Sequence, residues 1–196
     1  MTQALTRKRP GLERVLKTAD RLFYEEGIHA TGVDRIAAEA HVSKATLYTY
    51  FRTKDDLVTD YLHRRSRSWR EYVAGELPEH GASPEERLLA IFDLLGEWFL
   101  SPSYRGCPFI NSEAECAPGP SSEAHLANLE HRSWVHTLFG GLLKEAGVAE
   151  PEAIARQLML LYDGSMSGAQ ADPSVDWAAA AREAAESILR NHQTSH

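Results

Sequence analysis

Residues 44–50, Lys-Ala-Thr-Leu-Tyr-Thr-Tyr, and the nearby Lys54 combine basic, small and hydroxyl-bearing side chains in one short stretch. Lysine supplies positive charge near phosphates, threonine can hydrogen-bond a base edge or a phosphate, and a small alanine permits close approach and contact with a thymine methyl group. The tyrosine hydroxyls can reach phosphates, which position a protein without reading base sequence. The chemistry of this stretch is therefore that of binding to double-stranded DNA.

The pattern around this stretch predicts a helix over residues 33–40, a tight turn, and a second helix over residues 44–51. Ser43 can cap the second helix by accepting a hydrogen bond from an amide of its first turn. Leu47 and Phe51 are four residues apart and are expected to face inward, because that spacing places them on one face of a helix. The remaining faces would then present the polar side chains to DNA, as in a helix-turn-helix.

Apolar residues at helical spacing predict the other elements. We expect helices from about Pro10 to Gly27, from Lys54 to before Leu77, from Pro84 to Phe99, and over about 109–117, 121–147, 151–171 and 174–191. No stretch alternates long enough to predict a strand. The sequence thus predicts an all-α protein of about nine helices, with a three-helix domain in residues 1–53 and a helical bundle in residues 54–196.

Composition fits a soluble globular protein: of 196 residues, 43% are hydrophobic and 25% charged. The net charge is −7, but it is unevenly distributed. Residues 1–65 carry 12 basic and 9 acidic side chains, a net charge of +3, so residues 66–196 carry a net charge of −10. This asymmetry predicts a nucleic-acid surface near the amino terminus. With no signal peptide, no stretch of eighteen apolar residues and only two cysteines, we expect a cytoplasmic protein without membrane insertion, disulfide framework or four-cysteine zinc site.

Residues 10 to about 58 resemble the DNA-binding domain of the TetR (tetracycline-repressor-like) family of transcriptional regulators. The similarity lies in residues 19–23 with 26–27, the pair 36–37, and residues 42–51 followed by Lys54 and Leu57. Two residues depart from the family pattern, since His41 replaces a common glycine of the turn and Tyr50 a frequent histidine. A left-handed backbone costs histidine more than glycine, so His41 bears on the geometry of the turn.

The resemblance implies a homodimeric regulator, expected to be a repressor, that binds a palindromic operator and is released by a small-molecule effector. The last two helices would form the dimer core, and the middle helices would enclose a ligand pocket. Carried over position by position, the expected DNA contacts are Val33, Ser43, Lys44, Ala45, Thr46, Tyr48, Thr49, Tyr50 and Lys54.

Aromatic side chains and isolated polar groups in the bundle are candidates for the pocket, because a mostly apolar pocket uses few polar groups to orient a ligand. Aromatic residues at helical spacing can equally be core. The candidate ligand-binding residues are Trp69, Phe92, Trp98, Phe99, Phe109, Asn111, Glu113, Trp134, His136, Tyr162, Asp163 and Met166.

The stretch 158–169 is apolar on more than one side and rich in small residues, as helices that pair across a two-fold axis require. Together with the last predicted helix it is the candidate dimer interface. The residues expected there are Leu158, Leu161, Ser165, Gly168, Trp177, Ala181, Ala184 and Ile188.

Other chemistries find little support in the sequence. His125, His131 and His136 do not share a helical face, so no metal site is expected, and no phosphate loop or catalytic motif indicates an enzyme or a cofactor. Cys107 and Cys116 could form a redox switch or be ordinary buried residues. The alternative function is a small-molecule-binding or catalytic bundle in which the amino-terminal helices serve only assembly.

Overall fold

The computed structural model of the chain describes residues 10–116 and 122–192. Within these ranges the protein has nine α-helices, one short 3-10 helix at Leu77–Glu79 and no strand, so the predicted all-α class is confirmed. None of the described helices is long and apolar enough to cross a bilayer. The helices are α1 (Pro10–Glu26), α2 (Val33–Glu39), α3 (Lys44–Tyr50), α4 (Lys54–Glu76), α5 (Pro84–Phe99), α6 (Pro108–Glu115), α7 (Glu123–Glu145), α8 (Pro151–Ala171) and α9 (Trp177–His192).

Helices α1, α2 and α3 form a small unit with its own apolar centre. Leu22 of α1, Ile36 of α2 and Leu47 of α3 are all fully or almost fully buried there. The turn between α2 and α3 places His41 in the left-handed region, at φ 52°. Histidine therefore adopts the conformation for which glycine is favoured, and the turn keeps its helix-turn-helix form.

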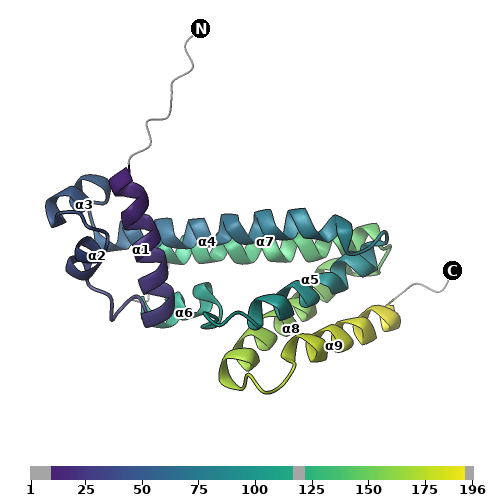
Figure 1. Cartoon of the computed structure of the whole chain (residues 1–196). Coiled ribbons are helices and arrows are strands. Elements are labelled where there is room, and N and C mark those ends of the chain that lie inside the picture. The colour runs from purple at the N-terminus through teal and green to yellow at the C-terminus, as the bar shows by residue number, and fades with distance from the viewer. Residues whose placement is uncertain (1–9, 117–121, 193–196) are drawn as a thin grey trace, which may run out of the picture.

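Helix α4 connects this unit to the rest of the protein. It begins with a capping box, in which the Thr53 side chain accepts a hydrogen bond from the Asp56 amide and the Asp56 carboxylate accepts one from the Thr53 amide. Its first turns pack on α1, where the rings of Tyr61 and Phe23 meet edge to face at 5.6 Å. The rest of α4 runs along α7, as Figure 1 shows.

The bundle is built from α5, α7, α8 and α9, which pack on one another, while the short α6 contacts α4 and α7. Figure 1 shows α1–α3 at one end of the long α4–α7 pair, with α9 on the outside of the bundle. Phe92 of α5 and Phe139 of α7 stack at 6.0 Å in the centre of the bundle and are fully buried. Helix α4, which packs on both α1 and α7, thus links the small unit to the bundle.

The last helix starts three residues later than the predicted Ser174. Ser174 donates hydrogen bonds from its amide and hydroxyl to the Asp172 carboxylate, which fold the chain into a turn. Asp176 supplies the cap instead, because its carboxylate accepts a hydrogen bond from the Ala179 amide at 2.9 Å.

Candidate DNA-binding surface and ligand cavity

Helix α3 presents a polar face to solvent and is anchored through the opposite side. Leu47 is 1% exposed in the core of the small unit, whereas Tyr48 is 42% exposed. Lys44, Ala45 and Thr49 are also exposed, and Thr46 and Tyr50 are half-buried. Most of the residues predicted to contact DNA therefore lie on an accessible helix surface.

The start of α3 is fixed by side-chain hydrogen bonds. The Ser43 hydroxyl oxygen accepts a bond of 3.0 Å from the Thr46 amide, which is the predicted cap. The Ser43 and Thr46 hydroxyls also share a hydrogen bond of 2.8 Å, and the Thr49 hydroxyl donates to the Thr46 carbonyl oxygen at 2.6 Å. These bonds orient the three hydroxyls relative to the helix axis and so preorganise the surface.

The charge of Lys44 is paired within the subunit. Its ammonium lies 2.7 Å from the Asp34 carboxylate of α2, and this hydrogen bond raises the pKa of Lys44. Both side chains are exposed, so the lysine can exchange this partner for a phosphate at small cost. Asp34 nevertheless places a negative charge beside the polar face of α3.

Two further predicted DNA contacts border α3. Lys54 starts α4, but its ammonium donates a hydrogen bond of 2.5 Å to the Ile28 carbonyl oxygen, so it also ties α4 to the segment after α1. An ammonium has three donors, which leaves two for a phosphate. Val33 is the first residue of α2 and is half-buried.

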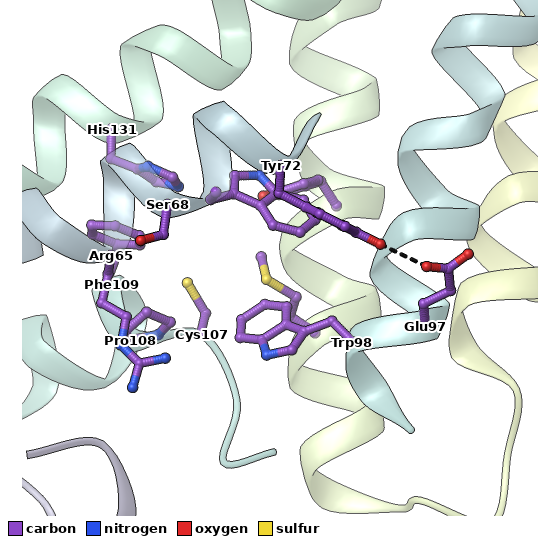
Figure 2. A pocket seen from close by; sticks show the side chains of 12 residues that line it. Arg65, Ser68, Tyr72, Glu97, Trp98, Cys107, Pro108, Phe109 and His131 are labelled. Carbon is purple, nitrogen blue, oxygen red and sulfur yellow. Dashed lines mark hydrogen bonds between the residues drawn. The ribbon is translucent and has the colours of Figure 1, made fainter. Parts of the chain in front are cut away.

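A cavity of about 410 Å³ lies between α4, α5, α6, α7 and α8. Its size is that of a pocket for a drug-sized small molecule. Figure 2 shows the side chains around it. The lining residues are Arg65, Ser68, Trp69, Tyr72, Glu97, Trp98, Cys107, Pro108, Phe109, His131, Tyr162 and Met166.

Five of the twelve candidate ligand-binding residues line this cavity, and the three other aromatic candidates do not. Phe92 is stacked on Phe139 in the core, and Phe99 packs against the Tyr104 ring at 5.0 Å. Trp134 faces the Arg70 guanidinium at 5.3 Å. These three rings pack against other side chains and do not line the cavity. The five that line it are Trp69, Trp98, Phe109, Tyr162 and Met166.

The four polar candidates are also engaged outside the cavity. The Asn111 side-chain amide donates a hydrogen bond to the Arg105 carbonyl oxygen at 2.7 Å, and the Glu113 carboxylate accepts one from the Asn128 side-chain amide at 2.6 Å. Asp163 forms an ion pair with Arg132 at 2.8 Å, and the His136 ring lies 3.9 Å from the Glu152 carboxylate. None of the four lines the cavity, and a role for them in orienting a ligand stays a prediction.

Seven residues that line the cavity were not among the candidates from the sequence. Three of these seven lie on α4, where they share a helical pattern with the candidate Trp69. Arg65, Ser68, Trp69 and Tyr72 recur at spacings of three, one and three, which is one stripe of a helix. That spacing around Trp69 was a signal available in the sequence. The missed residues are Arg65, Ser68, Tyr72, Glu97, Cys107, Pro108 and His131.

Burial keeps most titratable groups of the cavity uncharged. Desolvation, with further contributions from Arg70 and Arg132, lowers the pKa of His131 to about 3, so its ring is neutral. Burial also raises the pKa of the Cys107 thiol to about 11, which keeps it protonated and weakly nucleophilic. This environment does not favour the redox alternative for Cys107.

The cavity wall is joined directly to the small amino-terminal unit. Arg65 makes a two-point ion pair with Asp20 of α1, at 2.8 and 3.0 Å, and its guanidinium lies 4.1 Å from the centre of the Tyr24 ring. The Tyr24 hydroxyl in turn contacts residues 105 and 106, which precede the cavity residues Cys107 and Pro108. Arg65 and residues 105–106 therefore connect the cavity wall to α1.

The eight candidate dimer residues differ in how far they are exposed. Leu158, Ser165 and Ala181 are buried in the core of their own subunit, so they do not face a surface that a second copy could contact. Gly168 packs under the Trp177 ring, which a side chain at this position would meet at 2.4 Å. Leu161, Ala184 and Ile188 are half-buried and remain accessible in part.

The three histidines considered for metal binding lie in separate environments. His125 bonds to Glu113 at 2.9 Å, His131 to Ser66 at 3.0 Å, and His136 pairs with Glu152. Among the described residues no cluster of three metal-ligating side chains occurs.

Comparison with known proteins agrees with this architecture. The family profile "Bacterial regulatory proteins, tetR family" matches residues 15–61, which cover α1–α3 and the start of α4. The crystal structure of SCO4454, a TetR-family transcriptional regulator from Streptomyces coelicolor, superposes with a TM-score of 0.87 and 35% identity over 94% of this chain and 96% of that one.

Two further proteins are similar along most of their length. The regulator sav143 from Streptomyces avermitilis superposes with a TM-score of 0.81 and 27% identity, covering 95% of this chain and 99% of that one. The HTH-type transcriptional regulator YjdC of Escherichia coli is 27% identical over 183 residues, 91% of this chain and 93% of its own. With its helix-turn-helix, its nine-helix fold and these relatives, the chain belongs to the TetR family of transcriptional regulators, which are DNA-binding proteins and not enzymes.

Proposed function

We propose that the protein acts as a homodimer that represses transcription by placing its two α3 helices in successive major grooves of a palindromic operator. Support comes from the accessible polar face of α3, preorganised by the Ser43 cap. The proposed DNA contacts are those expected from the sequence, and the proposed boundary between the two domains lies at residues 53 and 54, where α4 begins.

We further propose that a small molecule in the cavity releases the DNA. Half-sites about one helical turn apart, roughly 34 Å, tolerate little change in the separation of two recognition helices. The observation that carries this proposal is the direct contact of the cavity residue Arg65 with Asp20 and Tyr24 of α1. A ligand that shifts Arg65 or residues 105–107 would tilt α1, and with it α3. Ligand and DNA would then weaken each other's binding equally.

The proposed dimer surface is the outer side of α8 and α9. Leu160 of α8 is 73% exposed, and Gly164 and Ser167 continue an exposed stripe at helical spacing. An apolar side chain flanked by small residues suits close pairing of helices across a two-fold axis. Ala184 and Ile188 of α9 would border this stripe, whereas the buried Leu158, Ser165 and Ala181 are left out.

The test of DNA binding uses Thr46→Ala and Tyr48→Ala in an anisotropy assay with duplex DNA from the region upstream of the protein's own gene. Each variant should bind about fivefold to tenfold more weakly. Thr137→Ala is the matched control, because that threonine is exposed on α7 and bonds only within its helix in the described structure, to the Ser133 carbonyl oxygen. Unchanged affinity in both α3 variants, with circular dichroism showing folded protein, would refute the proposed surface.

Lys54→Gln tests the phosphate contact separately. It should weaken binding to all sequences and reduce the slope of affinity against salt concentration by about one ion. Since Lys54 also holds the Ile28 carbonyl, the unfolding free energy of this variant must be measured alongside. A change of sequence preference in place of a uniform loss would contradict the assigned role.

A further inference from the structure

Of the two charged side chains that line the cavity, one has a partner of opposite charge and the other does not. Arg65 and Glu97 are the two lining residues that carry charge at neutral pH. The Arg65 guanidinium is neutralised by its two-point pair with Asp20. Glu97 accepts a hydrogen bond from the Tyr72 hydroxyl at 2.6 Å, and among the ion pairs of the described residues none includes it. Glu97 is itself exposed to solvent, so the uncompensated negative charge lies at the accessible side of the cavity.

The remaining polar groups do not alter this balance. The lowered pKa of His131 keeps its imidazole neutral, and the raised pKa of Cys107 keeps its thiol protonated. Burial also raises the pKa of Tyr162 well above its usual value, so this hydroxyl is uncharged. No second carboxylate and no free cation is found among the residues that line the cavity within the described part of the chain.

A cluster of aromatic rings adjoins the uncompensated carboxylate. Tyr72 bonds to Glu97 directly, and Trp98 is the next residue along α5. Trp69 lies 5.8 Å from both the Tyr72 and the Trp98 rings, measured between centroids. Figure 2 shows Tyr72 and Glu97 bridging one side of the cavity with Trp98 beside them. The faces of tryptophan and tyrosine rings attract cations because their π electrons are negative.

From this arrangement we propose that the effector of the cavity is an organic cation, either a hydrophobic amine or a quaternary ammonium compound. Its positive group would lie against Tyr72, Trp98 and Glu97, and its apolar body would extend toward Pro108 and Phe109, which Figure 2 shows on the other side of the cavity. An organic anion would instead meet the Glu97 charge, while the only lining cation, Arg65, already has Asp20 as its partner. This inference rests on the proposed role of the cavity as the effector site.

The test uses three probes that share a biphenylmethyl body and differ in their polar group: trimethylammonium, hydroxyl and carboxylate. Isothermal titration calorimetry of the full chain without DNA measures each affinity, and quenching of tryptophan fluorescence provides a second readout, since Trp69 and Trp98 line the cavity. The ammonium probe should bind about tenfold more tightly than the alcohol, and the carboxylate most weakly. Saturable binding of the carboxylate at equal or higher affinity, or no binding of the ammonium probe at millimolar concentration, would overturn the inference.

Glu97→Gln tests the charge, because glutamine can still accept the Tyr72 hydrogen bond. This variant should bind the ammonium probe about three to ten times more weakly and the alcohol unchanged. Asp93→Asn is the matched control, one helical turn away on α5, where Asp93 pairs with Arg182 outside the cavity. Equal losses for both probes, or equal effects of the two variants, would show that Glu97 does not recognise the charge.

The two proposals fail in different ways. These titrations contain no DNA, so preference for the ammonium probe can hold even where the operator assay fails. Conversely, a protein that binds its operator through α3 but shows no preference for the ammonium probe retains the proposed regulatory function and loses only the assigned class of effector.

Discussion

The Tyr24 hydroxyl donates a hydrogen bond of 3.0 Å to the Gly106 carbonyl oxygen and accepts one of 3.0 Å from the Arg105 amide. Tyr24 belongs to α1, and residues 105 and 106 lead directly into the cavity wall at Cys107. Gly106 has φ +81°, a conformation that favours glycine and brings its carbonyl to the tyrosine. One buried hydroxyl thus joins the DNA-binding unit to the ligand cavity.

Removing this hydroxyl should weaken both the fold and the communication between the two sites. Tyr24→Phe leaves the buried Gly106 carbonyl and the partly buried Arg105 amide without this partner, so the free energy of unfolding should fall by about 1–3 kcal/mol. The factor by which the trimethylammonium probe weakens operator binding should also decrease, because one contact between cavity and α1 is lost. Chemical denaturation measures the first effect, and anisotropy titrations with and without the probe measure the second.

Tyr72→Phe serves as the control for the stability effect alone, because Tyr72 belongs to the cavity wall. Its hydroxyl also makes one hydrogen bond, to Glu97, but the side chain is 37% exposed, so water replaces the lost partner. We expect a loss of less than about 0.5 kcal/mol there. Equal destabilisation by the two substitutions would argue against a special role for the Tyr24 contact.

Asp34 should reduce the affinity of the protein for DNA. Its carboxylate pairs with Lys44 at 2.7 Å and adds a negative charge beside the recognition helix. Asp34→Asn should therefore bind duplex DNA about two to five times more tightly at low salt, with the gain shrinking as salt screens the charge. Glu79→Gln removes an equally exposed charge from the 3-10 helix between α4 and α5 and should leave DNA affinity unchanged. Weaker binding by Asp34→Asn would mean that the carboxylate positions Lys44 and does not compete for it.

Leu160 should control the oligomeric state. Because this side chain is 73% exposed, Leu160→Asp should leave the stability of the subunit nearly unchanged while it places two like charges near the proposed two-fold axis. Sedimentation velocity should show a shift from dimer to monomer, and operator affinity should fall with it. Leu126→Asp on α7, where the side chain is 46% exposed, is the comparison and should remain dimeric. A dimer that persists in Leu160→Asp would place the interface elsewhere.

The sequence predicted the helices well because their signals are local. Ser43 caps α3 as predicted, α4 begins at the predicted Lys54, and the predicted inward residue Leu47 is buried. The cavity could not be predicted in the same way, since its lining depends on how each helix is rotated against its neighbours. On α5, Phe92 faces Phe139 whereas Trp98 faces the cavity, although both are aromatic residues of one amphipathic helix.

The same limit applies to single neighbouring positions on α8. Tyr162 lines the cavity, while the adjacent Asp163 points to the outer surface and binds Arg132. Both were predicted to contact a ligand, because a polar residue within an apolar stretch indicates a buried or binding role. The pattern does not say in which direction each side chain points. Successive residues on a helix differ by about 100° in direction, so only the packing of α8 decides between them.

His131 should make the stability of the protein depend on pH below neutrality. Its pKa is about 3 in the folded state, against about 6.5 in an unfolded chain. Between these values the unfolded state binds a proton that the folded state does not, so stability is complete above pH 6.5 and falls as the pH drops toward 3, by up to about 1.4 kcal/mol per pH unit. His131→Asn, which can keep the hydrogen bond to Ser66, should show a smaller loss of unfolding free energy between pH 7 and pH 5 in urea titrations. His29→Asn, at an exposed position, should keep the wild-type slope; if His131→Asn keeps it as well, the ring is not held neutral by burial.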